Sequence, residues 1–140
     1  MNHVIENPPA GIAHSYRLGF AVGAHSARHL RRIVRMFLAR WDMAELTEAA
    51  ELALTELVAN VVRHVPDRRC TVLILRRPGG LRVEVSDDHP GRPVPARPAR
   101  DELAEDGRGL VLVEAVTNRW GVLVPGPGGK TVWFECDGKP

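Results

Sequence analysis

The stretch at residues 52–65, LALTELVANVVRHV, constrains the fold more than any other part of the chain. Its leucine, valine and alanine residues recur at helical spacing, which predicts a largely buried helix. Along this helix Glu56, Asn60 and His64 follow one another at intervals of four residues, so they share one line of its surface. A carboxylate, an amide and an imidazole on an otherwise apolar helix indicate either a polar site or a strip that faces water.

Length and composition favour one globular domain. The chain has 140 residues, of which 44% are hydrophobic and 26% are charged. Its net charge of +2 is too small to indicate a nucleic-acid ligand, and no apolar run approaches the roughly 18 residues of a membrane span. The N-terminus lacks the plan of a signal peptide. We therefore expect a cytoplasmic protein that binds neither nucleic acid nor membrane directly.

The two cysteines, Cys70 and Cys136, stand far apart in the sequence and have no histidine pair nearby. Zinc sites and disulfide frameworks need closer or more numerous cysteines. We therefore expect reduced, buried thiols.

Periodicity and breaker residues predict the order of the elements. Two helix starts have specific signals: Ser26 is the expected N-cap of a helix at 26–41, and Asp42 with Glu45 has the spacing of a capping box for the next helix. The predicted elements are a strand at 15–22, helices at 26–41 and 42–65, strands at 70–77 and 81–87, a helix at 107–117, and a hairpin of strands at 119–124 and 130–136.

This order of elements predicts an α+β two-layer sandwich, in which helices cover one face of a mostly antiparallel sheet. Residues 1–13 contain Pro8, Pro9 and Gly11 and are expected to form a flexible tail. Residues 14–140 are expected to form a single domain, with a long proline-rich loop at 88–106.

Glu56 and Asn60 share a helix face, so their side chains point toward the same place. An asparagine can hold a hydrated Mg²⁺ ion while a neighbouring carboxylate handles a proton. Alternatively, both side chains simply face water. Arg63 and His64 on the following turn either reach phosphates or are ordinary surface residues.

The segment VEVSDD predicts a strand whose valines face inward and whose last residue, Asp87, stands at the strand end. Side chains at strand ends often line sites. A carboxylate there can accept a hydrogen bond from an amino group such as that of adenine. The alternative is an aspartate that only starts a turn.

Gly107 and Gly109 immediately precede an apolar helical run. Glycines allow the backbone to approach a ligand closely, and a helix N-terminus attracts anions. Arg108 between them can add a positive charge next to a phosphate. These residues close the long loop at 88–106, and loops of that length are often functional lids.

The segment GPGGKT is not a phosphate-binding P-loop. That motif, GxxxxGK[ST], would need glycine where this chain has Val124, and a helix where it has a strand. The segment therefore predicts a hairpin turn. No serine stands in a GxSxG nucleophile elbow either.

The helix at 26–41 carries a run of arginines with no acidic residue among them. This face is either a solvated surface or a concentrated positive field that steers an acidic protein partner. The arginines are Arg28, Arg31, Arg32, Arg35 and Arg40.

Four segments together resemble a known superfamily. ELVANVVRH, VEVSDD, DGRGLVLVEAV and GKTVWFE, in this order and spacing, are similar to the N, G1, G2 and terminal boxes of the GHKL (Bergerat-fold) ATPases. Within that superfamily, residues 14–136 resemble the small stand-alone anti-sigma factor/serine-protein kinases of bacteria. The resemblance implies the Bergerat, histidine-kinase-like ATPase fold, with the polar line of the helix at 52–65 facing the nucleotide.

The resemblance also implies roles for individual residues. Glu56 becomes the general base, Asn60 the Mg²⁺ ligand and Asp87 the residue that binds the adenine amino group. The remaining nucleotide-binding residues that it implies are Gly107, Arg108, Gly109 and Leu110 at the phosphate-side lid and helix start, and Thr131 as a support for Asp87 near the adenine. The chain departs from the pattern in the G1 box, where His89 stands in place of the first glycine of DxGxG.

The function that the resemblance implies is ATP- and Mg²⁺-dependent phosphorylation of a serine or threonine on an antagonist protein, together with sequestration of a sigma factor by a homodimer. Two alternatives stay open. One is a module that keeps ATP as a structural ligand and only sequesters its partner, and the other is the catalytic half of a split histidine kinase.

Overall fold

The computed structural model describes residues 14–89, 108–124, 126 and 128–139. The predicted tail at 1–13, nearly all of the predicted loop at 88–106, and Gly107 lie outside the described residues.

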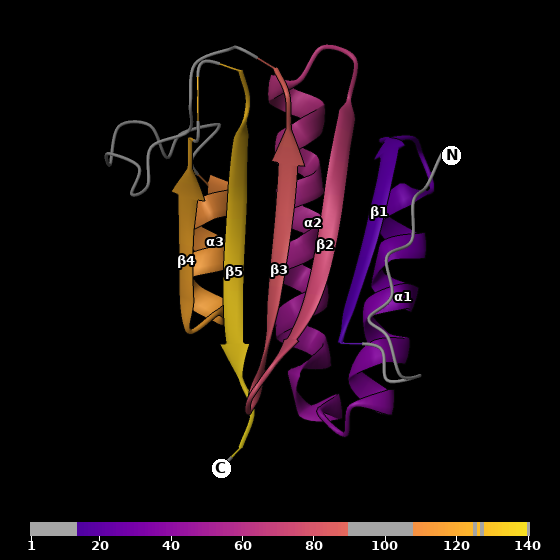
Figure 1. Cartoon of the computed structure of the whole chain (residues 1–140), viewed down its shortest axis with the longest axis vertical. Helices are drawn as coiled ribbons and strands as arrows, with labels where there is room; N and C mark the ends of the chain where they lie inside the picture. The colour runs from indigo at the N-terminus through magenta and orange to yellow at the C-terminus, as the bar shows by residue number, and fades with distance from the viewer. Residues whose placement is uncertain (1–13, 90–107, 125, 127, 140) are drawn as a thin grey trace.

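Five strands form one sheet in the order β1-β2-β3-β5-β4, and every neighbouring pair is antiparallel. The helices cover one face of this sheet (Figure 1). The predicted α+β two-layer sandwich is therefore confirmed. The strands are β1 (Ser15–Ala21), β2 (Arg69–Arg77), β3 (Gly80–Asp87), β4 (Arg119–Leu123) and β5 (Lys130–Asp137). The helices are α1 (Ser26–Arg40), the short 3₁₀ helix η1 (Ala44–Leu46), α2 (Thr47–His64) and α3 (Arg108–Val116).

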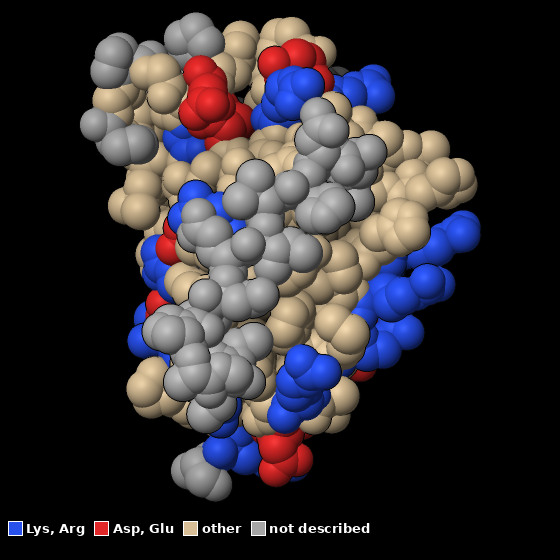
Figure 2. Space-filling model, turned by 45° about the vertical axis from the view of Figure 1, so that its right-hand side comes forward, with Lys and Arg blue, Asp and Glu red and all other residues tan. Residues whose placement is uncertain are grey.

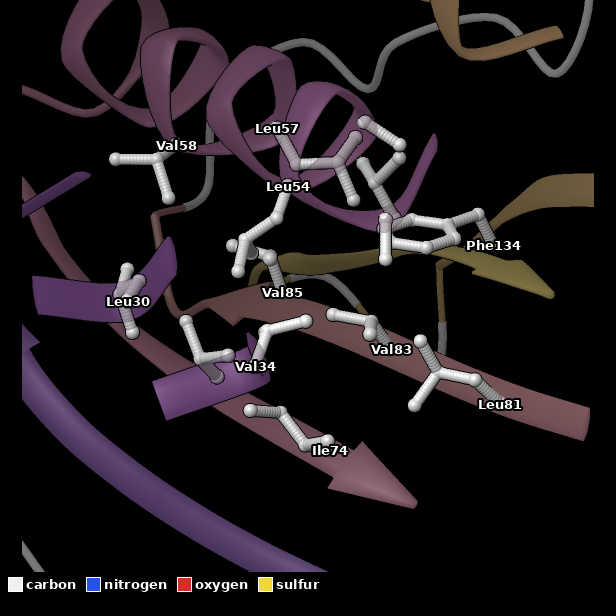
Figure 3. Close-up of a cluster of buried hydrophobic side chains, with 14 of the residues drawn as sticks. Leu30, Val34, Leu54, Leu57, Val58, Ile74, Leu81, Val83, Val85 and Phe134 are labelled. Carbon is white, nitrogen blue, oxygen red and sulfur yellow. The ribbon is translucent and has the colours of Figure 1, made fainter. Parts of the chain in front are cut away.

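The core lies between the helix layer and the inner face of the sheet. Strand residues alternate between the two faces, so every second side chain of β2, β3 and β5 points at the helices. Burying each large apolar side chain contributes roughly 1.5–3 kcal/mol. Figure 3 shows this packing among Leu30, Val34, Leu54, Leu57, Val58, Ile74, Leu81, Val83, Val85 and Phe134.

Strand register brings several chain segments to one end of the sheet. β3 stops at Asp87, directly opposite Lys130, where β5 starts. β2 starts at the same end, because its Thr71 lies opposite Ser86. α2 ends at His64, only a few residues before β2 begins. We call this the Asp87 end of the sheet.

α3 also starts at the Asp87 end. β4 finishes there, since Leu123 lies opposite Thr131 at the start of β5. α3 leads into β4 through a short connection, so its first residue, Arg108, lies at the opposite end from the start of β4. In Figure 1 the Asp87 end is at the top, with the C-terminus of α2 and the N-terminus of α3 beside it.

The predicted N-cap at Ser26 is wrong. His25 precedes α1, and no side chain caps its first turn by a hydrogen bond. The Ser26 hydroxyl instead accepts a hydrogen bond of 2.8 Å from the Gly23 backbone N–H. It therefore closes the turn that leads into the helix.

The predicted capping box of Asp42 and Glu45 is also wrong. Asp42 adopts a left-handed conformation with φ of 58°, and α2 starts only at Thr47, after η1. The connection turns in this way because Trp41, Met43 and Leu46 are all buried. Burial of these three side chains outweighs the local capping signal.

Cys70 and Cys136 are free and buried, as predicted. Burial raises the pKa of the Cys70 thiol to about 12, and the nearby charge of Asp87 adds to this effect. Within the described residues, no helix has the length and apolar character needed to cross a bilayer.

The outer face of the sheet carries an ion-pair network centred on Glu135. Its carboxylate accepts hydrogen bonds from Arg119 at 2.7 Å and Arg82 at 2.9 Å, and Arg77 lies 2.9 Å away. The Arg82 guanidinium also stacks on the Trp133 ring, 4.1 Å from its centroid. Burial alone would raise the pKa of Glu135, but the hydrogen bonds and the arginine charges outweigh it and lower this pKa below the usual range.

A lowered pKa in the folded state means that ionised Glu135 stabilises the fold above the pKa of an unfolded glutamate, about 4.3, and that this stabilisation disappears as the pH falls through the folded-state pKa. We expect Glu135→Gln to lower the free energy of unfolding at neutral pH by about 1.5–3 kcal/mol. Urea unfolding at neutral pH and in a series of buffers below about pH 4 measures this difference, which should shrink in acid. Glu84→Gln, with a single arginine partner, is the matched control. An equal difference at all pH values would contradict the assignment.

Candidate functional site

Asn60 is a buried polar residue near the C-terminal end of α2. It is 5% exposed and stands on the face of the helix that also carries buried Leu57 and Val61. Its Oδ1 accepts a hydrogen bond of 3.2 Å from Nη2 of Arg63, one turn further along. A buried amide needs such a partner. The bond fixes the direction of the Asn60 oxygen.

Glu56 lies one turn before Asn60 on the same helix and is half-buried. Within the part of the chain that the structure describes, its carboxylate makes no hydrogen bond and no ion pair. Arg63 is exposed, and His64 is half-buried at the last residue of α2. The predicted grouping of Glu56, Asn60 and Arg63 on neighbouring turns of one helix is therefore present.

Asp87 is buried at the end of β3, with its side chain only 4% exposed. Both carboxylate oxygens are held: Oδ2 accepts a hydrogen bond of 2.9 Å from Nζ of Lys130, and Oδ1 accepts one of 3.0 Å from the backbone N–H of His89. His89, the departure in the G1 box, thus contributes its backbone to Asp87.

Thr131, predicted to support Asp87 near the adenine, makes no hydrogen bond to Asp87 among the described residues. Its hydroxyl shares a hydrogen bond of 2.7 Å with the hydroxyl of Ser86. Thr131 and Ser86 are strand neighbours of Lys130 and Asp87, so their side chains point to the opposite face of the sheet. The ammonium of Lys130 donates a hydrogen bond to Asp87, although Lys130 was not among the predicted site residues.

A tight backbone approach fixes the start of β5. Gly129 has a φ of +98°, and a Cβ at this position would collide with the backbone carbonyl of Asp87 and lie 2.9 Å from the Cα of Asp88. Only glycine fits both the dihedral angle and the space. The chain can therefore pass close over the end of β3 and place Lys130 opposite Asp87.

The start of α3 completes the Asp87 end. The helix begins at Arg108 and Gly109, and its first turn carries no acidic residue that would repel an anion. Leu110 is buried in the core, so its side chain anchors this helix end and only its backbone can face a ligand. Gly107 lies outside the described residues.

These groups have the chemistry that a magnesium nucleotide requires. Asp87 offers an acceptor for an amino group, the start of α3 offers backbone N–H donors for phosphate, and Asn60 offers an amide oxygen for a cation. Mg²⁺ bound with a nucleotide usually takes one or two protein ligands and completes its shell with phosphate oxygens and waters. In the ranges that the structure covers, no three His, Cys, Asp or Glu side chains gather into a metal site.

Comparison with known proteins agrees with this geometry. The family model of the histidine kinase-like ATPase domain matches residues 21–136. No curated protein matches the chain. The family match includes α2, β3, α3 and nearly all of β5, which contribute the described groups named above at the Asp87 end, and it supports ATP as the ligand. Because it also covers most of the sequence, the chain belongs to the histidine kinase-like ATPase domain family.

Proposed function

We propose that this domain is an ATP-dependent serine/threonine protein kinase of the anti-sigma type, which phosphorylates an antagonist protein and sequesters a sigma factor. The observation that carries the proposal is the carboxylate of Glu56. It is half-buried, has no hydrogen-bond or ion-pair partner among the described residues, and lies one helical turn from the buried amide of Asn60. Such a carboxylate is free to accept a proton.

The reaction forms a bond between the oxygen of a serine or threonine and the γ-phosphorus of ATP, and breaks the bond from that phosphorus to the β–γ bridging oxygen. Glu56 accepts the hydroxyl proton of the substrate, and the backbone at the start of α3 donates hydrogen bonds to the phosphates. Asn60 would hold Mg²⁺ through its amide oxygen, and the ion would supply positive charge next to the phosphates. The rest of catalysis is positioning.

Asp87 holds the nucleobase in this scheme. Its carboxylate accepts a hydrogen bond from the amino group of adenine, and the His89 N–H and the Lys130 ammonium keep the carboxylate in place. A backbone N–H can donate this hydrogen bond whichever side chain its residue has. The histidine in the G1 box is therefore compatible with a working base site.

The kinase proposal is tested by incubating the purified chain with γ-labelled ATP and candidate antagonist proteins. We expect label on a serine or threonine of one of them, in an acid-stable ester. Transfer of label to a histidine, in an acid-labile form, would favour the catalytic half of a split histidine kinase. ATP binding and partner binding without any transfer would favour a module that only sequesters its partner.

The proposed protein partner has a candidate docking surface on α1. Figure 2 shows lysine and arginine side chains gathered along the side of the molecule where α1 lies. Arg35 is bound to Glu51 at 2.7 Å and Arg31 donates to Thr55 at 3.4 Å, so these two arginines are tied to α2. Arg28 and Arg32 are exposed, one helical turn apart, and suit an acidic partner.

We predict that Arg28→Glu/Arg32→Glu leaves ATP affinity unchanged and slows association with the antagonist protein by about 10-fold or more at low salt, because it reverses the steering field. The effect should shrink as salt rises. Stopped-flow association rates measure it. Arg76→Glu/Lys139→Glu, with the same change in charge at exposed positions outside α1, is the matched control. Wild-type association rates for the α1 variant at low salt would contradict a role of this face in partner binding.

A further inference from the structure

Lys130 is the least expected member of the Asp87 end. Lysine is almost never buried unless its charge is paired, yet the Lys130 side chain is only 8% exposed. An ammonium group carries three N–H donors. One of them goes to Oδ2 of Asp87, and no other hydrogen bond of this group is made within the described residues.

Stability does not explain this ion pair. Taking a lysine and an aspartate out of water carries a desolvation cost that their attraction often fails to recover, so apolar residues of similar volume would serve the fold equally well or better. The surrounding positions of the inner sheet face, Val85 and Val132, are apolar. The charged pair occupies the last register position of β3 and β5, at the Asp87 end of the sheet.

The geometry allows the pair to recognise two neighbouring groups of a ligand. Asp87 and Lys130 are directly opposite one another on the same face of the sheet, with their charged atoms 2.9 Å apart. Gly129 packs closely against the backbone of Asp87 at the start of β5, so the backbone of Lys130 has a defined position. The pair therefore presents a hydrogen-bond acceptor and a hydrogen-bond donor side by side.

We propose that Lys130 is a specificity-determining residue for the nucleobase, and that its ammonium donates a hydrogen bond to the ring nitrogen N1 of adenine. This inference rests on the proposed nucleotide-binding function. The amino group of adenine is a donor and its neighbouring N1 is an acceptor, so Asp87 and Lys130 together complement that edge. A lone carboxylate, which only accepts hydrogen bonds, would recognise the amino group but not N1.

The same pair discriminates against guanine held in that pose. Guanine has a carbonyl oxygen where adenine has its amino group, and an N–H where adenine has N1. The carbonyl oxygen would face the Asp87 carboxylate and the N–H would face the Lys130 ammonium. Two mismatched contacts would replace two hydrogen bonds.

The test compares ATP with 1-deaza-ATP, in which carbon replaces N1, in wild type and in Lys130→Met. Methionine keeps a similar length and has no donor. We expect wild type to bind 1-deaza-ATP about 5- to 150-fold more weakly than ATP, the worth of one unmade buried hydrogen bond. In Lys130→Met the two nucleotides should bind within about twofold of each other, because nothing then reads N1. Dissociation constants from calorimetry give this readout without any measurement of activity.

A control addresses the fold. Lys130→Met leaves the Asp87 carboxylate buried without its partner, so the comparison is repeated in Asp87→Asn/Lys130→Met, which removes both charges and keeps an acceptor oxygen at position 87. The same loss of preference is expected. An unchanged preference for ATP over 1-deaza-ATP in either variant overturns the inference alone, since Lys130 would then only hold Asp87. A wild-type protein that binds neither nucleotide overturns the proposed function and the inference together.

Discussion

Replacing Glu56 with glutamine is expected to leave ATP bound and to slow phosphotransfer to the antagonist protein by about 10²–10⁴-fold, the usual contribution of a positioned general base. Glutamine matches glutamate in size but cannot accept the substrate proton. Among the described residues Glu56 has no hydrogen-bond or ion-pair partner, so the substitution breaks no described hydrogen bond or ion pair of the folded chain. The loss should therefore be confined to the transfer step.

Single-turnover transfer of label from γ-labelled ATP measures the rate, and a separate titration measures ATP affinity. Glu48→Gln is the matched control, because it makes the same change at an exposed position of the first turn of α2. Its transfer rate should equal that of wild type. Loss of nucleotide binding in Glu56→Gln, with a normal rate per bound ATP, would show that the role of Glu56 had been misassigned.

The architecture follows from sequence patterns because its signals are long and agree with one another. β2, β3 and β5 each alternate between apolar inner and polar outer residues, and the sequence places all three within a few residues of their observed bounds. α2 is apolar enough to be recognised as buried, and Asn60 is conspicuous on it for the same reason.

Short local signals failed where tertiary packing opposed them. Asp42 and Glu45 have the spacing of a capping box but do not form one. Burial of Trp41 and Met43 requires the chain to turn at Asp42, before α2 starts. The hydroxyl of Ser26 found a partner in the preceding turn. A cap contributes about 1 kcal/mol, less than the burial of a large apolar side chain.

The partners of the site residues depend on strand register, which local patterns do not give. Asp87 and Lys130 are 43 positions apart in the sequence and meet only because β3 and β5 pair with these two residues opposite each other. One signal did exist. Val132 and Phe134 face inward, so the period of two puts Lys130, rather than Thr131, on their side of the sheet.

Replacing Asp87 with alanine is expected to weaken ATP binding about 5- to 150-fold, because the adenine amino group would enter a buried site without an acceptor, at a cost of about 1–3 kcal/mol. The same change leaves the Lys130 ammonium buried without its partner. Breaking a buried ion pair in this way typically costs about 3–5 kcal/mol of stability. Asp87→Ala should therefore unfold at a lower temperature than wild type, and its affinity must be measured below that temperature.

The most direct test of a nucleotide site at the Asp87 end is calorimetric titration of Mg·ATP into wild type, Asp87→Ala and Glu84→Ala, each first shown by circular dichroism to be folded. Glu84 is a carboxylate of the same strand on the opposite, outer face of the sheet. We predict that wild type and Glu84→Ala bind ATP with equal affinity and that Asp87→Ala binds it about 5- to 150-fold more weakly. Equal affinity in folded Asp87→Ala, or no binding by wild type, would contradict the site.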